Sequence, residues 1–82
     1  MAYEYTTQGT CARKILFDIQ DGKVRDVQFV SGCNGNTQGV AALAEGMDVD
    51  DVIARLKGIK CGMKPTSCPD QLALALEAVK NA

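Results

Sequence analysis

The sequence predicts an α+β domain in which a three-stranded antiparallel sheet is followed by three helices packed on one of its faces. Within the first 30 residues, apolar side chains recur at every second position, which is the period of a half-buried strand. After Cys33 they recur instead at the three- and four-residue spacing of a helix. Because strands followed by helices are typical of α+β proteins, we expect residues 1–82 to form one such domain. The expected strands are residues 2–7, residues 14–19 and a segment around residues 27–29.

The second and third expected strands form a hairpin that turns at Asp21-Gly22. A two-residue loop would set Leu16 opposite Val27 and mix apolar and polar residues on each face. A three-residue loop that starts at Gln20, with a left-handed glycine at its end, sets Ile15 opposite Val27 and separates the faces. We therefore expect the three-residue loop. The side chains expected to face the helices are Ile15, Phe17, Val27 and Phe29.

Each of the three expected helices has its own boundary signals. The first begins within a few residues of Cys33 and ends at Gly46. The second is capped by Asp48, and the third begins where Pro69 fits the first helical position, which makes Cys68 its N-cap. The expected apolar faces are Val40, Leu43 and Met47 on the first helix, Val49, Val52, Ile53 and Leu56 on the second, and Leu72, Ala75, Leu76 and Val79 on the third.

The composition favours a small folded domain and gives no indication of a nucleic-acid or membrane partner. Eighty-two residues lie near the lower limit for a single hydrophobic core, so a metal or an interface between copies of the chain is expected to add support. A net charge of −1 gives no indication of binding to nucleic acid or to an anionic membrane. Without a long apolar run or a signal-peptide pattern, we expect a cytoplasmic protein with no membrane partner.

The chain contains four cysteines and no histidine, and this pairing is its strongest indication of chemistry. In a reducing compartment, four cysteines are expected to be ligands or reactive thiols rather than disulfides. An all-thiolate site suits zinc or an iron–sulfur cluster and argues against imidazole acid–base chemistry. The alternative is that the cysteines are small buried apolar residues, since free cysteine is often buried. The candidate ligands are Cys11, Cys33, Cys61 and Cys68.

The predicted topology brings these cysteines to one end of the sheet. Cys11 and Cys33 border the hairpin strands at the end opposite Asp21-Gly22, and Cys61 and Cys68 lie at the entry to the third helix. The starts of helices stabilise a thiolate through their unpaired backbone N–H groups. Asp70 is a candidate fifth ligand or hydrogen-bond acceptor, or a structural residue in the first helical turn.

A glycine- and asparagine-rich turn at residues 32–36 admits two interpretations. A turn of this composition that opens a helix can present backbone N–H groups to a phosphate or another anion. The same composition is also typical of a turn that needs positive φ angles and binds nothing.

Four short motifs resemble those of a known family. They are GCNGN at 32–36, EGM at 45–47, GIKCG at 58–62 and TSCPD at 66–70. Together they identify the chain as resembling the stand-alone TSCPD domain family along nearly its whole length. A related domain occurs at the C-terminus of some B12-dependent ribonucleotide reductases. The resemblance therefore implies a metal-binding or accessory role, with the four cysteines as shared ligands and a ribonucleotide reductase as a partner.

A second similarity is to the NifU/IscU-type iron–sulfur assembly scaffold. Cys11, Cys33 and Cys68 follow the order of cysteine, hairpin, cysteine at a helix start and cysteine before a final helix. This similarity implies a NifU/IscU-like fold and a cluster-assembly protein as a partner. The chain departs from the pattern by adding Cys61 and by lacking an acidic residue beside the first cysteine and a histidine near the last. The departures favour a stably held ion.

We therefore expect a cytoplasmic metal-binding module with a four-cysteine site for zinc or an iron–sulfur cluster. Zinc comes first, because closed four-cysteine sites are usually structural zinc sites. The alternatives are a ribonucleotide reductase accessory domain, a carrier of clusters or thiols, and a domain whose thiols bind no metal. Eighty-two residues leave no room for a catalytic barrel or a corrinoid pocket, so the chain is not expected to be a reductase by itself.

Overall fold

The computed structural model describes residues 2–7, 13–30, 34–60, 62–63 and 65–81. Three antiparallel strands in the order β1-β2-β3 are followed by three helices, which confirms the predicted α+β class. The elements are β1 (Ala2–Thr6), β2 (Lys14–Gln20), β3 (Lys23–Val30), α1 (Asn34–Ala44), α2 (Val49–Leu56) and α3 (Cys68–Lys80).

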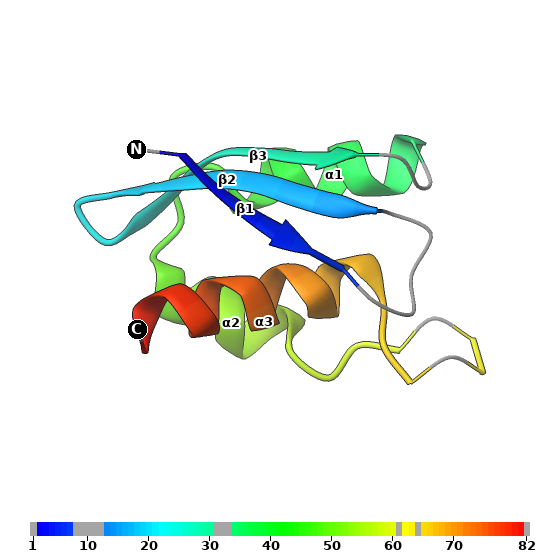
Figure 1. Cartoon of the computed structure of the whole chain (residues 1–82). Helices are drawn as coiled ribbons and strands as arrows, with labels where there is room; N and C mark the ends of the chain where they lie inside the picture. Colours follow the sequence, from blue (N-terminus) through cyan, green and yellow to red (C-terminus); the bar gives the residue numbers. More distant parts are fainter. Residues whose placement is uncertain (1, 8–12, 31–33, 61, 64, 82) are drawn as a thin grey trace.

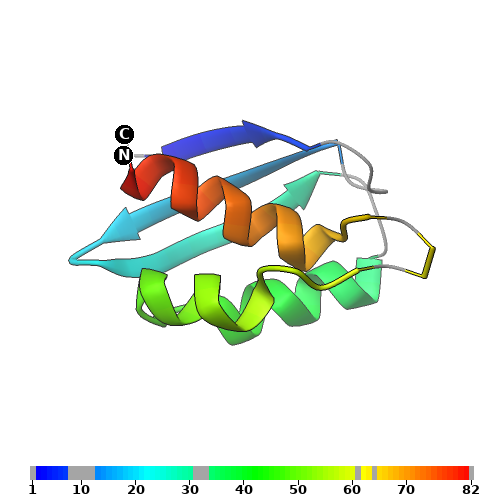
Figure 2. The same ribbon diagram turned by 90° about the horizontal axis from the view of Figure 1, so that it is seen from below.

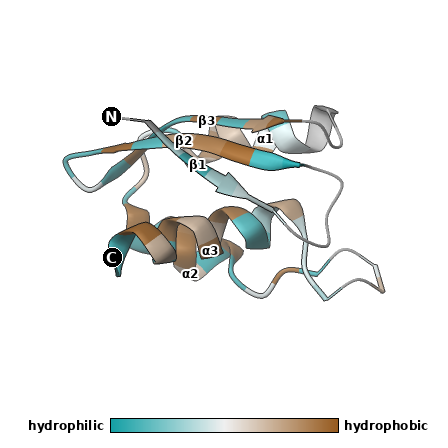
Figure 3. Cartoon of the chain, viewed as in Figure 1, coloured by the Kyte–Doolittle hydropathy of each residue, from teal (hydrophilic) through white to brown (hydrophobic). Residues whose placement is uncertain are grey.

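The helices and the sheet share one hydrophobic core. α3 crosses one face of the sheet with α2 beside it, and α1 runs along β3 (Figures 1 and 2). The apolar residues of β2 and of the helices gather in the layer between them (Figure 3). The strand face expected to be apolar is confirmed, because Ile15 and Phe17 are buried while Val27 and Phe29 pack against the same core. The other members of the core are Val24, Ala44, Val49, Val52, Leu72, Ala75 and Leu76.

The expected register of the hairpin is wrong. Gln20 pairs with Lys23, so the loop contains only Asp21 and Gly22 rather than three residues. Both loop residues have positive φ angles, 55° for Asp21 and 76° for Gly22. Two left-handed residues are the requirement of the type I′ turn, whose twist matches that of the paired strands, and aspartate tolerates this conformation.

A β-bulge in β3 restores the separation of the two faces. The register shifts between Leu16 and Asp18, so that Phe17 is opposed by both Asp26 and Val27. Asp26 has a φ of 56°, as expected for an inserted residue that bends the strand. Beyond the bulge Ile15 pairs with Phe29 and not with Val27 as expected. The extra residue returns Val27 and Phe29 to the core side, which is why the face was predicted correctly from a wrong register.

The outer edge of β3 is covered by the chain that follows α1. The Gly46 N–H donates to the Val24 carbonyl, and the Val24 N–H donates to the Met47 carbonyl, both at 2.8 Å. Gly46 has a φ of 79°, which glycine adopts without strain as the chain leaves the helix. Residues 45–47, the EGM motif, thus satisfy the backbone groups of an edge strand.

Glu45 compensates for the break that the bulge makes in the ladder. Its Oε1 accepts a hydrogen bond from the Asp26 N–H at 2.9 Å, and its Oε2 accepts one from Arg25 Nη1 at 3.1 Å. The Asp26 N–H and then Arg25 lower the pKa of the Glu45 carboxyl below its ordinary value of 4.5.

We expect Glu45→Gln to make the free energy of unfolding less dependent on pH in the acidic range. Because the folded-state pKa lies below the unfolded one, the ionised carboxylate stabilises the fold above the unfolded pKa, and this contribution is lost as pH falls through the folded-state pKa. Urea midpoints should therefore differ between wild type and Glu45→Gln at neutral pH. They should converge once the pH has fallen below the folded-state pKa of Glu45, which itself lies below 4.5. Glu77→Gln is the control, since it removes an exposed ion pair to Lys57. An equal loss in both variants at every pH would contradict the role of Glu45.

The helices confirm most of the expected faces, with two corrections. Leu43 was expected to face the core but is 78% exposed, and Ala44 is buried in its place. α1 ends at Ala44, so Met47 lies beyond the helix and the spacing from Val40 to Met47 does not define a face. Asp48 precedes α2 as expected, but its side chain makes no cap hydrogen bond and contacts Lys23 Nζ at 3.1 Å. In the described part of the chain, no helix is long and apolar enough to span a bilayer.

Candidate functional site

The candidate ligands are distributed over three connections of the fold and the first turn of α3. In the sequence Cys11 lies between β1 and β2, Cys33 directly before α1, and Cys61 between α2 and α3. These three cysteines, and the turn at residues 32–36 up to Cys33, lie outside the described residues. The expected approach of the four sulfurs therefore stays a prediction. Among the described residues, no three metal-ligating side chains come together. The candidate ligand among the described residues is Cys68, a free and buried thiol.

The described residues that border the cysteines lie at one end of the molecule. The Thr7 N–H donates to the Arg13 carbonyl at 3.1 Å, and the Arg13 N–H donates to the Val30 carbonyl at 2.8 Å. These contacts join the end of β1, the start of β2 and the end of β3. The first turn of α3 lies at this same end, opposite the β2–β3 turn (Figures 1 and 2).

Cys68 is the first residue of α3, and the expectation that it caps the helix is wrong. The N-cap is Ser67, whose Oγ accepts a hydrogen bond from the Asp70 N–H at 3.1 Å. The Ser67 hydroxyl also donates to the Ile59 carbonyl at 2.6 Å. A serine oxygen is a far better cap acceptor than a thiol, and Pro69 is tolerated anywhere in the first turn because no backbone donor is needed there. The helix therefore starts one residue earlier than the proline suggested.

Asp70 closes the connection between α2 and α3. Its Oδ1 accepts a hydrogen bond from the Gly58 N–H at 2.7 Å, and its Oδ2 accepts one from the Thr66 hydroxyl. Gln71 Nε2 donates to Thr66 Oγ1 at 2.9 Å. Thr66, Ser67, Asp70 and Gln71 are all buried. Both carboxylate oxygens of Asp70 thus hold the chain, which supports the structural interpretation of this residue.

This set of hydrogen bonds gives the TSCPD signature a physical meaning, and we call it the TSCPD clamp. It consists of Thr66, Ser67, Asp70 and Gln71, and it fastens Gly58 and Ile59 to the first turn of α3. The segment between these attachment points carries Cys61 in the sequence. Ser67 and Asp70 have the spacing of a capping box, a signal in the sequence that identifies the true N-cap. Thr66 and Gln71 have no comparable signal.

We expect Ser67→Ala to lower the free energy of unfolding by about 1–2 kcal/mol, because it removes the cap acceptor and the donor to Ile59. Asp48→Ala is the matched control, since Asp48 occupies an N-cap position without capping and its ion pair to Lys23 is exposed. Urea unfolding at unchanged slope measures both effects. A larger loss for Asp48→Ala than for Ser67→Ala would contradict these cap assignments.

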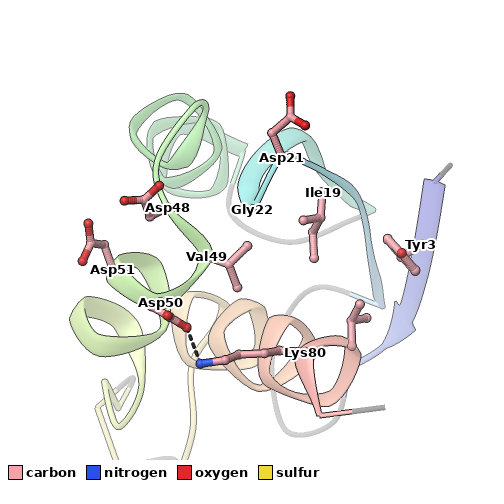
Figure 4. A pocket seen from close by; sticks show the side chains of 10 residues that line it. Tyr3, Ile19, Asp21, Gly22, Asp48, Val49, Asp50, Asp51 and Lys80 are labelled. Atoms are coloured by element: carbon pink, nitrogen blue, oxygen red, sulfur yellow. Dashed lines mark hydrogen bonds and ion pairs between the residues drawn. The ribbon is translucent and has the colours of Figure 1, made fainter.

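A separate pocket of about 630 Å³ lies at the other end of the fold (Figure 4). Ile19 and Val49 point toward its centre, whereas Asp48 and Asp51 point outward. Asp50 forms an ion pair with Lys80 across its lower rim. Cys68, the described candidate ligand, does not line this pocket.

The comparison with family models gives a single assignment that covers nearly the whole chain. The TSCPD domain model matches residues 1–80. No curated protein and no solved structure matches the chain. The expected similarity to the NifU/IscU-type scaffold is therefore not supported by these comparisons. The match includes all four cysteines, the EGM segment that covers β3 and the TSCPD clamp. The chain belongs to the TSCPD domain family.

Proposed function

We propose that this chain is a metal-binding module that holds one metal centre through its four cysteines. The observation that carries the proposal is the placement of the described residues that border them, which share one end of the fold with the free, buried thiol of Cys68. The proposed ligands are Cys11, Cys33, Cys61 and Cys68.

The donor set fits zinc first and an iron–sulfur cluster second. Four thiolates and no histidine form the ligand set of closed structural zinc sites, and iron–sulfur clusters are also held by four cysteines. Cys68 lies in the first turn of α3 as a free and buried thiol, at the end of the helix where the dipole is positive. A bound ion would cross-link the segments between the helices and strands, and would add stability that the small core does not supply by itself.

The TSCPD clamp supports the proposal because it restrains the segment that carries one of the proposed ligands. Ser67 and Asp70 restrain the backbone on both sides of the segment that carries Cys61. A restrained segment loses less conformational entropy when a metal binds, which favours affinity. The clamp's side chains bond to one another and to the backbone, so they would orient the ligands without contacting the ion. As a metal-holding accessory domain, the chain would serve a ribonucleotide reductase or a cluster-assembly protein, the partner classes that the resemblance implies.

We expect metal removal to lower the midpoint of thermal unfolding, because an ion that binds only the folded state adds its binding free energy to stability. Cys68→Ser should lower the midpoint of the metal-loaded protein and make it insensitive to chelator. Met63→Ser is the control, since it removes a fully exposed sulfur near the same segment and should remain sensitive. Identical midpoints for wild type with and without chelator, after anaerobic purification, would contradict a stabilising metal.

A further inference from the structure

The two edge strands of the sheet, β1 and β3, differ in whether another segment of the described chain covers them. Residues 45–47 cover the edge of β3 by exchanging backbone hydrogen bonds with Val24. β1 is the opposite edge, and among the described residues its only strand partner is β2. An edge strand with unpaired N–H and C=O groups is a template for pairing with another strand.

The hydrogen bond at the end of the β1–β2 ladder shows which backbone N–H and C=O groups of β1 point away from β2. The Thr7 N–H donates to the Arg13 carbonyl at 3.1 Å, so Thr7 directs its backbone groups toward β2. In an antiparallel pair this direction alternates along the strand, so Tyr5 and Tyr3 also face β2. Glu4 and Thr6 therefore direct their N–H and C=O groups toward the open edge.

A groove beside this edge is shaped for apolar side chains. It has a volume of about 440 Å³ and lies between β1 and α3. Tyr3 stacks on Phe17 with the ring centroids 5.5 Å apart, and Tyr5 packs against the same core. The small side chains Ala75 and Ala78 line the α3 side of the groove. A strand added to β1 would place every second side chain over this groove.

The charged residue on β1, Glu4, does not prevent this edge from pairing with another strand. Lysine and other charges commonly keep edge strands from pairing. Here the exposed Glu4 carboxylate forms an ion pair with Lys14 Nζ at 3.1 Å, so the two charges on this part of the sheet neutralise each other. β1 also contains no proline and makes no register shift against β2.

We infer that β1 pairs in antiparallel fashion with β1 of a second copy of this chain. The pairing that fits best sets Tyr5 opposite Tyr5 of the second copy and Glu4 opposite Thr6. Glu4 and Thr6 then exchange backbone hydrogen bonds, and the two Tyr5 rings meet at the closely spaced position of the ladder. A register centred on Glu4 would set two carboxylates opposite each other, which is destabilising. This register pairs each Glu4 with an uncharged Thr6 and brings the two Tyr5 rings together, which favours a copy of the same chain over an unrelated peptide.

Glu4→Pro tests the pairing without removing a backbone hydrogen bond of the monomer, because the Glu4 N–H faces away from β2 and proline is tolerated on a free edge. It does remove the exposed ion pair to Lys14. Glu4→Ala is the matched control, since it loses the same ion pair but keeps the N–H group. Sedimentation equilibrium should show wild type and Glu4→Ala rising with concentration toward twice the monomer mass of 8.7 kDa. Glu4→Pro should stay at the monomer mass with an unchanged far-ultraviolet circular dichroism spectrum.

A wild-type protein that stays monomeric at every concentration would overturn the inference, and so would a folded Glu4→Pro variant that still dimerises. If Glu4→Pro fails to fold, amide hydrogen exchange of the wild type decides. The Glu4 and Thr6 amides should exchange more slowly as protein concentration rises, whereas the Tyr5 amide, bonded within the monomer, should not change. Equal exchange of Glu4 and Thr6 at all concentrations would show that β1 is not the interface.

Discussion

Phe17→Ala is expected to lower the free energy of unfolding by about 3–5 kcal/mol. Phe17 is the largest fully buried side chain of the described core, at 1% exposure, and its removal would leave a cavity between the sheet and the helices. The stacked contact with Tyr3 would be lost as well. A chain of 82 residues has a total stability of roughly 4–12 kcal/mol, so this variant would lose between about a quarter and all of its stability.

Leu43→Ala is the matched control for Phe17→Ala, because Leu43 is apolar but 78% exposed. Its effect should stay within about 0.5 kcal/mol. Urea unfolding followed by circular dichroism, at unchanged slope, measures both variants. Similar losses in the two variants would show that the core is not centred on the face of β2 that carries Phe17.

Asp70→Ala is expected to cost about 2–4 kcal/mol, because it leaves two donors of the clamp without their acceptor. The Gly58 N–H and the Thr66 hydroxyl both donate to Asp70, and Thr66 is buried. Asp70→Asn should lie between wild type and alanine. Its amide oxygen can still accept from Gly58, but its nitrogen cannot accept the Thr66 proton.

The effect of Asp70→Ala should extend to metal binding, although Asp70 is not proposed as a ligand. Loss of the Gly58 contact releases one attachment of the segment that carries Cys61, so zinc affinity should fall while the number of ions bound at saturation stays the same. Competition with a chelator of known affinity measures the first quantity, and elemental analysis measures the second. An unchanged affinity in a folded Asp70→Ala protein would show that the clamp stabilises the fold without preparing the metal site.

Most of the fold could be predicted from periodicity, and the errors have local causes. Alternation placed Ile15 and Phe17 in the core, but the hairpin register depended on a bulge at Asp26. A bulge adds one residue without changing the alternation on either side of it, so the pattern alone permits more than one register. Leu43 was misplaced because the end of α1 at Ala44 breaks a spacing that seemed to continue to Met47.

The chemical nature of the candidate site could be predicted from the sequence, but the hydrogen bonds that hold the surrounding chain could not. The four cysteines and the absence of histidine define a thiolate donor set directly from composition. The clamp depends instead on Gly58 and Asp70 meeting across twelve positions of sequence, which no local pattern encodes. The same holds for the hydrogen bond from Asp26 to Glu45, where a motif residue serves a strand that is distant in the sequence.

The most direct test of the central claim is the metal content of protein purified without oxygen, measured by elemental analysis together with the absorption spectrum. We predict one zinc ion per chain in wild type and in Met63→Ser, with little zinc in Cys68→Ser. Iron and sulfide with visible absorption would keep the four-cysteine site and change its occupant to a cluster. Wild-type protein that retains no metal, even after reconstitution with zinc or with iron and sulfide, would contradict the claim that these cysteines form a metal site.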